Sequence, residues 1–91
     1  MANPVPQKVN PGSGNAGDIF SPLVTGDALL DVVKADFGPE IGTVSVKVID
    51  GTSVKVKIHI SLEAKPGKRN VILTNTSGQS GTLHQGFEVV L

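Results

Sequence analysis

The sequence has no cysteine, tryptophan or tyrosine, and its aromatic side chains are three phenylalanines, Phe20, Phe37 and Phe87. The absence of cysteine excludes disulfides, thiolate metal sites and a cysteine nucleophile. No apolar run approaches the roughly 18 residues that a membrane-spanning helix needs. Sugar-binding faces and single-strand nucleic-acid platforms usually stack rings on aromatic side chains, so the scarcity of aromatics counts against both kinds of site.

The chain of 91 residues is instead rich in glycine, proline and β-branched residues. Eleven glycines and six prolines accompany 13 valines, six isoleucines and six threonines. Valine, isoleucine and threonine favour strands, whereas glycine and proline favour turns. The length suits one domain, and the composition predicts a compact, turn-rich β fold.

Basic and acidic side chains balance, eight against eight, but they are segregated along the chain. Residues 1–40 carry two lysines and five carboxylates (net −3), residues 41–72 carry six basic and two acidic side chains (net +4), and Glu88 adds −1. A net charge of zero argues against general attraction to nucleic acid or an anionic membrane. It leaves room for a local basic surface.

Two segments in the middle of the chain alternate apolar and polar residues, as strands with one buried face do. These segments are residues 44–48 and 54–63, and Asp50-Gly51 between them is a hairpin signal. Parity requires a three-residue loop over 49–51, or a bulge of the same effect, because only then do both apolar rows share a face. In the three-residue loop Val46 pairs with Val54, and Gly51 takes the left-handed conformation.

Further short strands are expected over residues 23–25 and 69–75, and a last strand is expected to begin at Gly86 and to include Leu91. Residues 27–37 fit either a helical turn or a strand, and we favour a strand over 32–37 with Val33, Ala35 and Phe37 inward. About seven short strands separated by turns predict an antiparallel β-sandwich. The predicted core is Val24, Phe37, Val46, Val48, Val54, Val56, Ile58, Ile60, Val71, Leu73, Phe87 and Val89.

A family resemblance covers nearly the whole chain, from about residue 4 to 91. Residues 64–78 read AKPGKRNVILTNTSG and lead to GFEV at 86–89, which resembles the bacterial IPT/TIG immunoglobulin-like domain. The VNPGSG of residues 9–14 and the VTG of residues 24–26 are similar to the opening of that family. The chain departs from the family at Ala28-Leu29, where the family commonly has a glycine and an aromatic residue.

The resemblance implies an all-β, immunoglobulin-like (E-set type) sandwich as a single domain over residues 4–91. Residues 1–12 are expected to form a proline-rich N-terminal arm or edge segment, with Pro4, Val5 and Pro6 as candidate packing residues. The family carries no catalytic residues, so none is transferred, and no cofactor or metal site is expected.

The sequence offers one charged cluster as a candidate contact surface. Lys47, Lys55 and Lys57 should share the solvent face of the central hairpin, with His59 at its end. One interpretation is contact with a polyanion, and the other is that the lysines protect a sheet edge from pairing with other edges. His59 and His84 lack the spacing of a metal site.

Two other motifs have ordinary explanations. The glycines of 12–17 spell G-x-G-x-x-G, but Pro22 stands where the helix of a nucleotide site would grow, so a tight edge-strand turn is favoured. Residues 75–77 match a glycosylation sequon, a tripeptide that is common by chance.

The leading functional hypothesis is a non-enzymatic structural or interaction module, a spacer or adhesive domain of an exported or cell-surface bacterial protein. Its partners would be proteins (neighbouring domains, copies of itself or a surface assembly), with no nucleic acid and no membrane insertion. One alternative is a virion accessory protein on the surface of a phage capsid or tail, held by the proline-rich arm. A second is a carbohydrate-binding module, against which the missing aromatics count.

Overall fold

The computed structural model describes residues 3–90. These residues form strands joined by turns and loops. None of these residues belongs to a helix that is long and apolar enough to cross a membrane. The strands in chain order are β1 (Val5–Asn10), β2 (Ser13–Asn15), β3 (Ile19–Phe20), β4 (Leu23–Asp27), β5 (Val32–Asp36), β6 (Ile41–Asp50), β7 (Ser53–Ile60), β8 (Gly67–Asn75) and β9 (Ser80–Val90).

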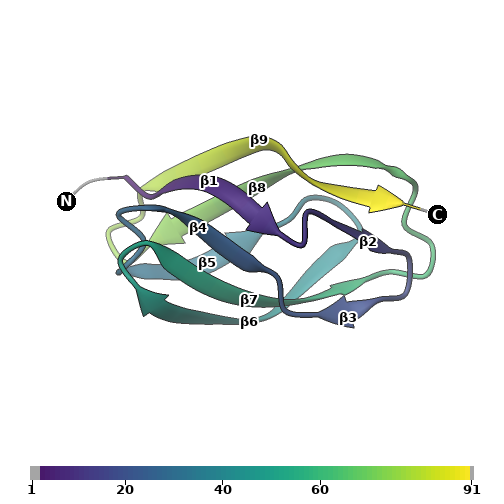
Figure 1. The fold of residues 1–91 in the computed structure, drawn as a ribbon, viewed down its shortest axis with the longest axis horizontal. Helices are drawn as coiled ribbons and strands as arrows, with labels where there is room; N and C mark the ends of the chain where they lie inside the picture. The colour runs from purple at the N-terminus through teal and green to yellow at the C-terminus, as the bar shows by residue number, and fades with distance from the viewer. Residues whose placement is uncertain (1–2, 91) are drawn as a thin grey trace.

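The strands form two sheets that pack face to face along the long axis of the molecule (Figure 1). One sheet joins β1, β4, β7 and β3 in that order, with β6 along the other edge of β7, and the second joins β2, β9, β8 and β5. Every pairing is antiparallel except that of β2 with β9, which is parallel. The predicted immunoglobulin-like sandwich is therefore confirmed, and the short strands β2 and β3 raise the number of strands above the expected seven.

The core between the sheets is aliphatic and surrounds two of the phenylalanines. Strand β7 contributes Val54, Val56, Ile58 and Ile60, none of which has exposed surface. The alternation predicted over residues 54–63 is therefore confirmed as far as Ile60, where the strand ends, but it was wrong at Leu62, which is 82% exposed. The other buried members of the predicted core are Val24, Phe37, Val71, Leu73, Phe87 and Val89. Val46 and Val48 are only partly buried and pack against this core. Leu91 lies outside the described residues.

In the β6–β7 hairpin the two apolar rows share a face, as predicted. A β-bulge brings this about, and the three-residue loop is not formed. Val48 pairs with Val54 and Val46 with Val56, and the register shifts between Val48 and Asp50. The pairing of residue 46 with residue 54 was therefore wrong by two residues, although the valine rows do share a face. Gly51 does not take a positive φ, so the left-handed conformation predicted for it was wrong.

The Asp50 side chain closes this turn through two hydrogen bonds. Its Oδ1 accepts from the Thr52 backbone N at 2.8 Å and from the Thr52 hydroxyl at 2.9 Å. The backbone donor, followed by the hydroxyl, lowers the pKa of Asp50 below its ordinary value, because hydrogen bonds to a carboxylate favour its charged form.

A β-bulge in β5 reverses one predicted orientation. Pairing with β8 shifts between Val32 and Lys34, so that Val32 is buried and Val33 is 59% exposed. The inward orientation predicted for Val33 was wrong, whereas Ala35 and Phe37 do face the core. An extra residue on one strand of a pair re-aims the side chains beside it.

A similar bulge in β6 turns Val44 outward. Pairing with β7 shifts between Thr43 and Ser45, and Val44 is left 60% exposed at the shift. Ile49, at the second shift in the same strand, is also exposed. The apolar row of β6 is therefore shorter than its sequence alternation suggests.

Strand β9 is longer than expected and begins at Ser80 rather than at Gly86. Residues 80–83 pair with residues 71–74 of β8, and residues 87–89 pair with residues 67–69. Between these two stretches Gln85 takes a positive φ and its backbone N donates to the Asn70 side chain at 2.9 Å. The polar residues 84–86 (HQG) therefore lie within the strand. The apolar alternation that begins at Gly86 shows only the last part of it.

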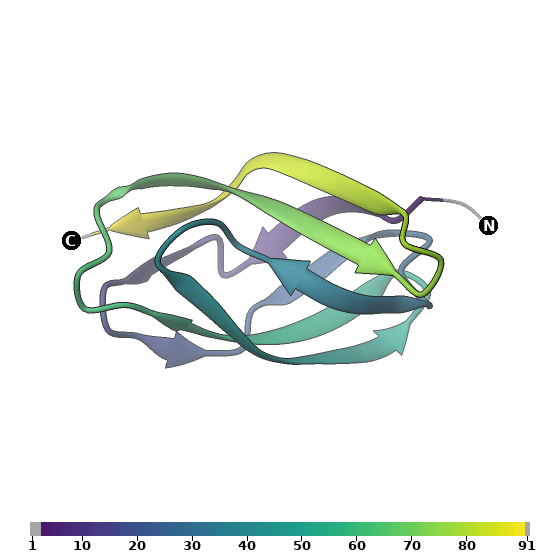
Figure 2. The ribbon, with the colours of Figure 1, turned by 180° about the vertical axis from the view of Figure 1, so that it is seen from behind.

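The two long margins of the sandwich differ, and we name them here. At the closed margin, β1 packs against β9 of the opposite sheet. At the open margin, β5 and β6 of opposite sheets run side by side, joined by residues 37–40 (Figure 2). There the Thr43 hydroxyl donates to the Ala35 carbonyl at 2.8 Å, linking the two strands. Four exposed apolar side chains belong to this margin or its adjoining turn, namely Leu30, Val33, Val44 and Ile49.

Candidate functional site

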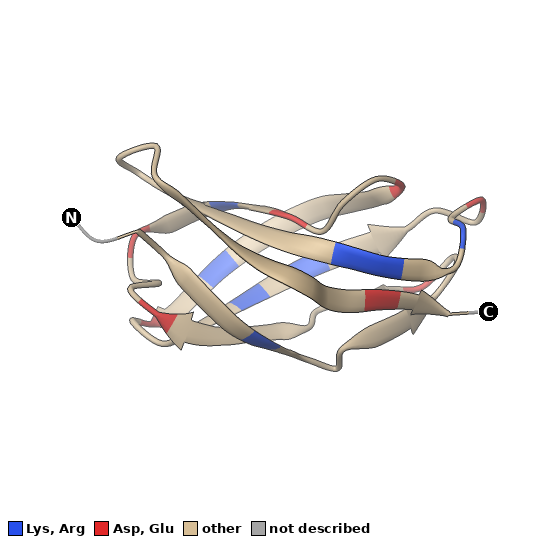
Figure 3. Ribbon diagram, turned by 90° about the horizontal axis from the view of Figure 1, so that it is seen from above, with Lys and Arg blue, Asp and Glu red and all other residues tan. Residues whose placement is uncertain are grey.

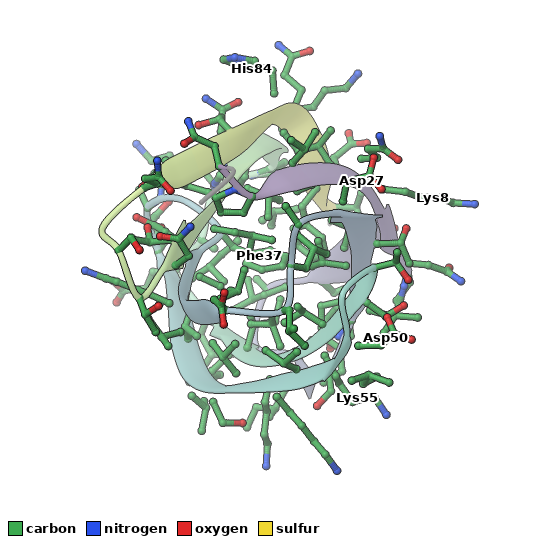
Figure 4. All side chains as sticks on the ribbon, turned by 90° about the vertical axis from the view of Figure 1, so that its left-hand side faces the viewer. Lys8, Asp27, Phe37, Asp50, Lys55 and His84 are labelled. Atoms are coloured by element: carbon green, nitrogen blue, oxygen red, sulfur yellow. The ribbon has the colours of Figure 1, made fainter. Side chains whose placement is uncertain are left out.

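The three central lysines lie together on the outer face of one sheet, as predicted. Lys47 of β6 is the direct cross-strand partner of Lys55 in β7, and Lys57 follows one outward position along β7, opposite Ser45. All three side chains are exposed. Figure 4 shows Lys55 pointing into solvent on the side of the sheet away from Phe37. We call Lys47, Lys55 and Lys57 the lysine cluster.

The spacing of the lysine cluster follows from strand geometry. Directly opposite residues have Cβ atoms about 5 Å apart, and alternate residues along a strand are roughly 6.7 Å apart. Like charges placed directly opposite one another destabilise a sheet. The Lys47–Lys55 pair is therefore an unfavourable arrangement unless an anion lies near it.

None of the three lysines forms an ion pair with a carboxylate within residues 3–90. The ion pair that these residues do contain joins Arg69 and Glu40 at 3.6 Å, on another part of the molecule. Figure 3 shows blue bands on neighbouring strands near the middle of the molecule, and red bands toward both of its ends.

Several carboxylates are instead engaged with backbone donors in turns. Asp18 accepts from the Asn15 backbone N at 2.9 Å, and Asp36 accepts from the Gly38 backbone N at 2.8 Å. Asp50 closes the β6–β7 turn in the same manner. These acids stabilise local turns, and none of them forms an ion pair with the lysine cluster within residues 3–90.

His59 ends the row of outward residues on β7, where Gly42 and Ile19 are its partners on either side. It lines an open hollow together with Glu40, Ser61 and Glu63. Within the described residues, no group of three or more histidine or acidic side chains has a geometry that could hold a metal ion. His84 is exposed on β9, far from this hollow and pointing into solvent (Figure 4).

The proline-rich N-terminal segment is built into the domain rather than extending from it. Pro4 and Pro6 are buried and Val5 is 47% exposed. The segment passes so close to two glycines that a Cβ on Gly81 would overlap the Pro4 carbonyl, and one on Gly26 would overlap the Val5 carbonyl. The predicted edge position of β1 is correct, but a free arm with Pro4 and Pro6 available for a partner is not present.

Arg69 holds together the loops at the C-terminal end, a role that the sequence did not reveal. Its Nη2 donates to the Lys65 carbonyl at 2.7 Å, and its Nε donates to the Pro39 carbonyl at 3.4 Å. Its ion pair with Glu40 joins the same two loops. Pro39 and Glu40 are distant from Arg69 in the sequence, so its role in linking the loops is visible only in the folded chain.

The two remaining motifs have structural roles. The G-x-G-x-x-G segment contains β2, which pairs with β9, and a turn follows it rather than the helix that a phosphate loop requires. In the sequon, Asn75 is 3% exposed, and its Oδ1 accepts from the backbone N of both Ser77 and Gln79 at 3.0 Å. Asn75 therefore shapes the β8–β9 turn and is not open to a glycosylating enzyme.

The phenylalanines form a single buried group. The rings of Phe37 and Phe87 meet edge to face with centroids 5.4 Å apart, and the centroid of Phe20 lies 6.1 Å from that of Phe87. Phe37 and Phe87 are completely buried, and Phe20 packs against the core. With both core rings enclosed, the described surface offers no flat aromatic platform for a sugar or a base.

Comparison with known proteins supports the fold alone. No family model matches the sequence, and no curated protein matches it. Among solved structures, the chain is similar to the gamma-CGTase from Alkalophilic bacillus clarkii, with 19% identity and a TM-score of 0.58. The match covers 98% of this chain but spans 12% of that enzyme's length. The comparison and the two packed sheets agree that this chain is an immunoglobulin-like β-sandwich.

Proposed function

We propose that this domain is a non-enzymatic spacer and interaction module of the IPT/TIG type within an exported or cell-surface bacterial protein. The observation that carries the proposal is the position of the chain ends. The molecule measures 38 × 20 × 20 Å, and its N- and C-terminal ends lie at opposite ends of the long axis (Figure 1). A domain of this shape adds its full length when it is joined to neighbours in a row.

Two further observations support a modular role. The sandwich resembles a small part of a much longer chain, the gamma-CGTase, so this fold also occurs as one portion of a larger protein. The IPT/TIG-like phrase in residues 64–89 points to a family of such modules. Fold alone does not give function, so the proposal rests on the geometry of the ends.

The other functional hypotheses gain less support. Attachment to a virion through a proline-rich arm would require Pro4 and Pro6, which are buried inside the domain. A carbohydrate-binding module usually offers exposed aromatic rings, whereas Phe37 and Phe87 have no exposed surface.

The spacer proposal is tested by joining two copies of the full chain end to end and measuring small-angle X-ray scattering. We expect a maximum dimension of about twice the 38 Å of one copy, with the single chain as the control. A tandem protein whose maximum dimension stays near that of one copy would mean that the domains fold back on each other, and the spacer role would be wrong.

A further inference from the structure

The lysine cluster combines an unfavourable charge arrangement with a well-defined geometry. Lys47 and Lys55 are direct cross-strand partners, so two positive charges stand side by side at a position where opposite charges would stabilise the sheet. Lys57 extends the positive charge along β7. The three lysines therefore rise from a right-angled set of strand positions with sides of about 5 and 7 Å.

The direct cross-strand partners of Lys55 and Lys57, other than Lys47, are uncharged. Ser45 lies opposite Lys57, and Leu23 of β4 is the partner of Lys55 on its other side. In the next row, Thr25 pairs with Ser53. On its other side Ser53 is paired with Asp50 of β6, whose carboxylate accepts hydrogen bonds from Thr52. Hydroxyl groups can donate hydrogen bonds to anionic oxygens, and none of the three lysines forms an ion pair with a carboxylate within residues 3–90.

The array suits a chain of anionic groups better than a single anion. The lysines rise from a sheet surface rather than enclosing a cavity, so no one anion can be surrounded by them. A linear polymer with closely spaced phosphates can place successive charges over Lys47, Lys55 and Lys57, and it gains entropy by releasing the counterions condensed on it. The absence of an aromatic ring on this face removes any advantage for bases, which bind by stacking.

We propose that the outer face of β6 and β7, through Lys47, Lys55 and Lys57, binds a linear phosphate polymer by charge and without reading bases. In the context of the proposed spacer role, this face would hold the module alongside an anionic polymer. The two proposals can fail separately, because the scattering experiment on the tandem protein does not involve the lysine cluster.

The experiment measures binding of long-chain inorganic polyphosphate to the full chain at low ionic strength by isothermal titration calorimetry. The test variant carries K47Q, K55Q and K57Q, and the matched control carries K34Q, K65Q and K68Q. Both variants lose three positive charges, but the control lysines lie outside the cluster, on β5, β8 and the loop before β8. Thermal unfolding of each variant confirms that it folds.

We expect the cluster variant to lose at least tenfold in affinity and the control variant to lose less than threefold. Wild-type affinity should fall as salt rises, with a slope of about −2 to −3 in log K against log salt for three neutralised phosphates. Equal losses in the two variants, or no binding by the wild type, would overturn the proposal. A single-stranded DNA that binds tenfold more tightly than polyphosphate, at equal phosphate concentration, would also overturn it in favour of base recognition.

Discussion

The closed and open margins join the same two sheets by different means. At the closed margin the main chain of Pro4, just before β1, packs directly against Gly81 of the opposite sheet, leaving no space for a side chain there. At the open margin a hydroxyl of Thr43 reaches the carbonyl of Ala35, and the side chains of Val33 and Val44 face outward. Backbone thus packs against backbone at the closed margin, whereas a side-chain hydrogen bond links the two strands at the open margin.

The difference shows where this sandwich is tightly specified. Dense packing of backbone against backbone tolerates no added volume, so the closed margin fixes the relative position of the sheets. The open margin leaves Val33 and Val44 exposed, and segments with few buried contacts open more readily than the rest of a domain. Substitutions at the closed margin should therefore have larger effects on stability than substitutions at the open margin.

The largest effect is expected for Gly81→Ala at the closed margin. The added methyl group would overlap the Pro4 carbonyl, and relieving that overlap requires the backbone of β1 or β9 to move. We expect the free energy of unfolding to fall by about 3 kcal/mol, measured by urea denaturation. Gly51→Ala is the matched control, because a Cβ there meets nothing within 4 Å. A small loss for Gly81→Ala, similar to that of the control, would show that the closed margin is not tightly packed.

An intermediate effect is expected for Thr43→Val, which keeps the shape of the side chain and removes the hydroxyl. The Ala35 carbonyl then loses its partner across the open margin, and we expect a loss of about 1 kcal/mol in unfolding free energy. Thr82→Val is the control, since Thr82 is exposed and its hydroxyl makes no hydrogen bond within the described residues. Equal results for the two variants in chemical denaturation would remove this bond as a link between the sheets.

The smallest effect is expected for Val44→Thr at the β6 bulge. Because Val44 is exposed, the hydroxyl stays in water, and the unfolding free energy should change by less than about 0.5 kcal/mol. The same exchange at the buried Val54 should cost roughly 2 kcal/mol, since it buries a hydroxyl in the core. If thermal melts showed similar losses for both, Val44 would have to face the core, and the bulge would be placed wrongly.

The sequence predicted β7 well because one physical constraint dominates there. Ten residues of alternation leave one face apolar and one polar, and a slip of one residue would bury Lys55 and Lys57. The positions of the lysine cluster follow from the same constraint, which is why these candidate site residues could be placed without a structure.

The bulges of β5 and β6 could not be predicted in the same way. Val33 and Val44 are apolar residues in strand-forming segments, and nothing in the local pattern distinguishes them from Val32 or Val46. A bulge arises from pairing with a distant strand and from the twist of the sheet. The inward orientations expected from the alternation were therefore wrong at the bulges, where pairing with a neighbouring strand leaves one extra residue.

The role of the N-terminal prolines was also hidden from sequence inspection. Prolines suit a sheet edge or a loop equally well, and the decisive partners, Gly26 and Gly81, are far away in the chain. The hydrogen bonds by which Arg69 links two loops could not be predicted for the same reason. Their acceptors belong to loops that only the folded chain brings together.

The parallel pairing of β2 with β9 has a mechanical consequence. Ser13–Asn15 lie beside Glu88–Val90 in parallel, close to the C-terminal end of the molecule (Figure 1). A pull on the two chain ends draws β2 toward one end and β9 toward the other, so the strands must slide past each other. Their hydrogen bonds are then loaded together in shear rather than opened one after another, and tension along the chain meets its resistance at this short pair of strands.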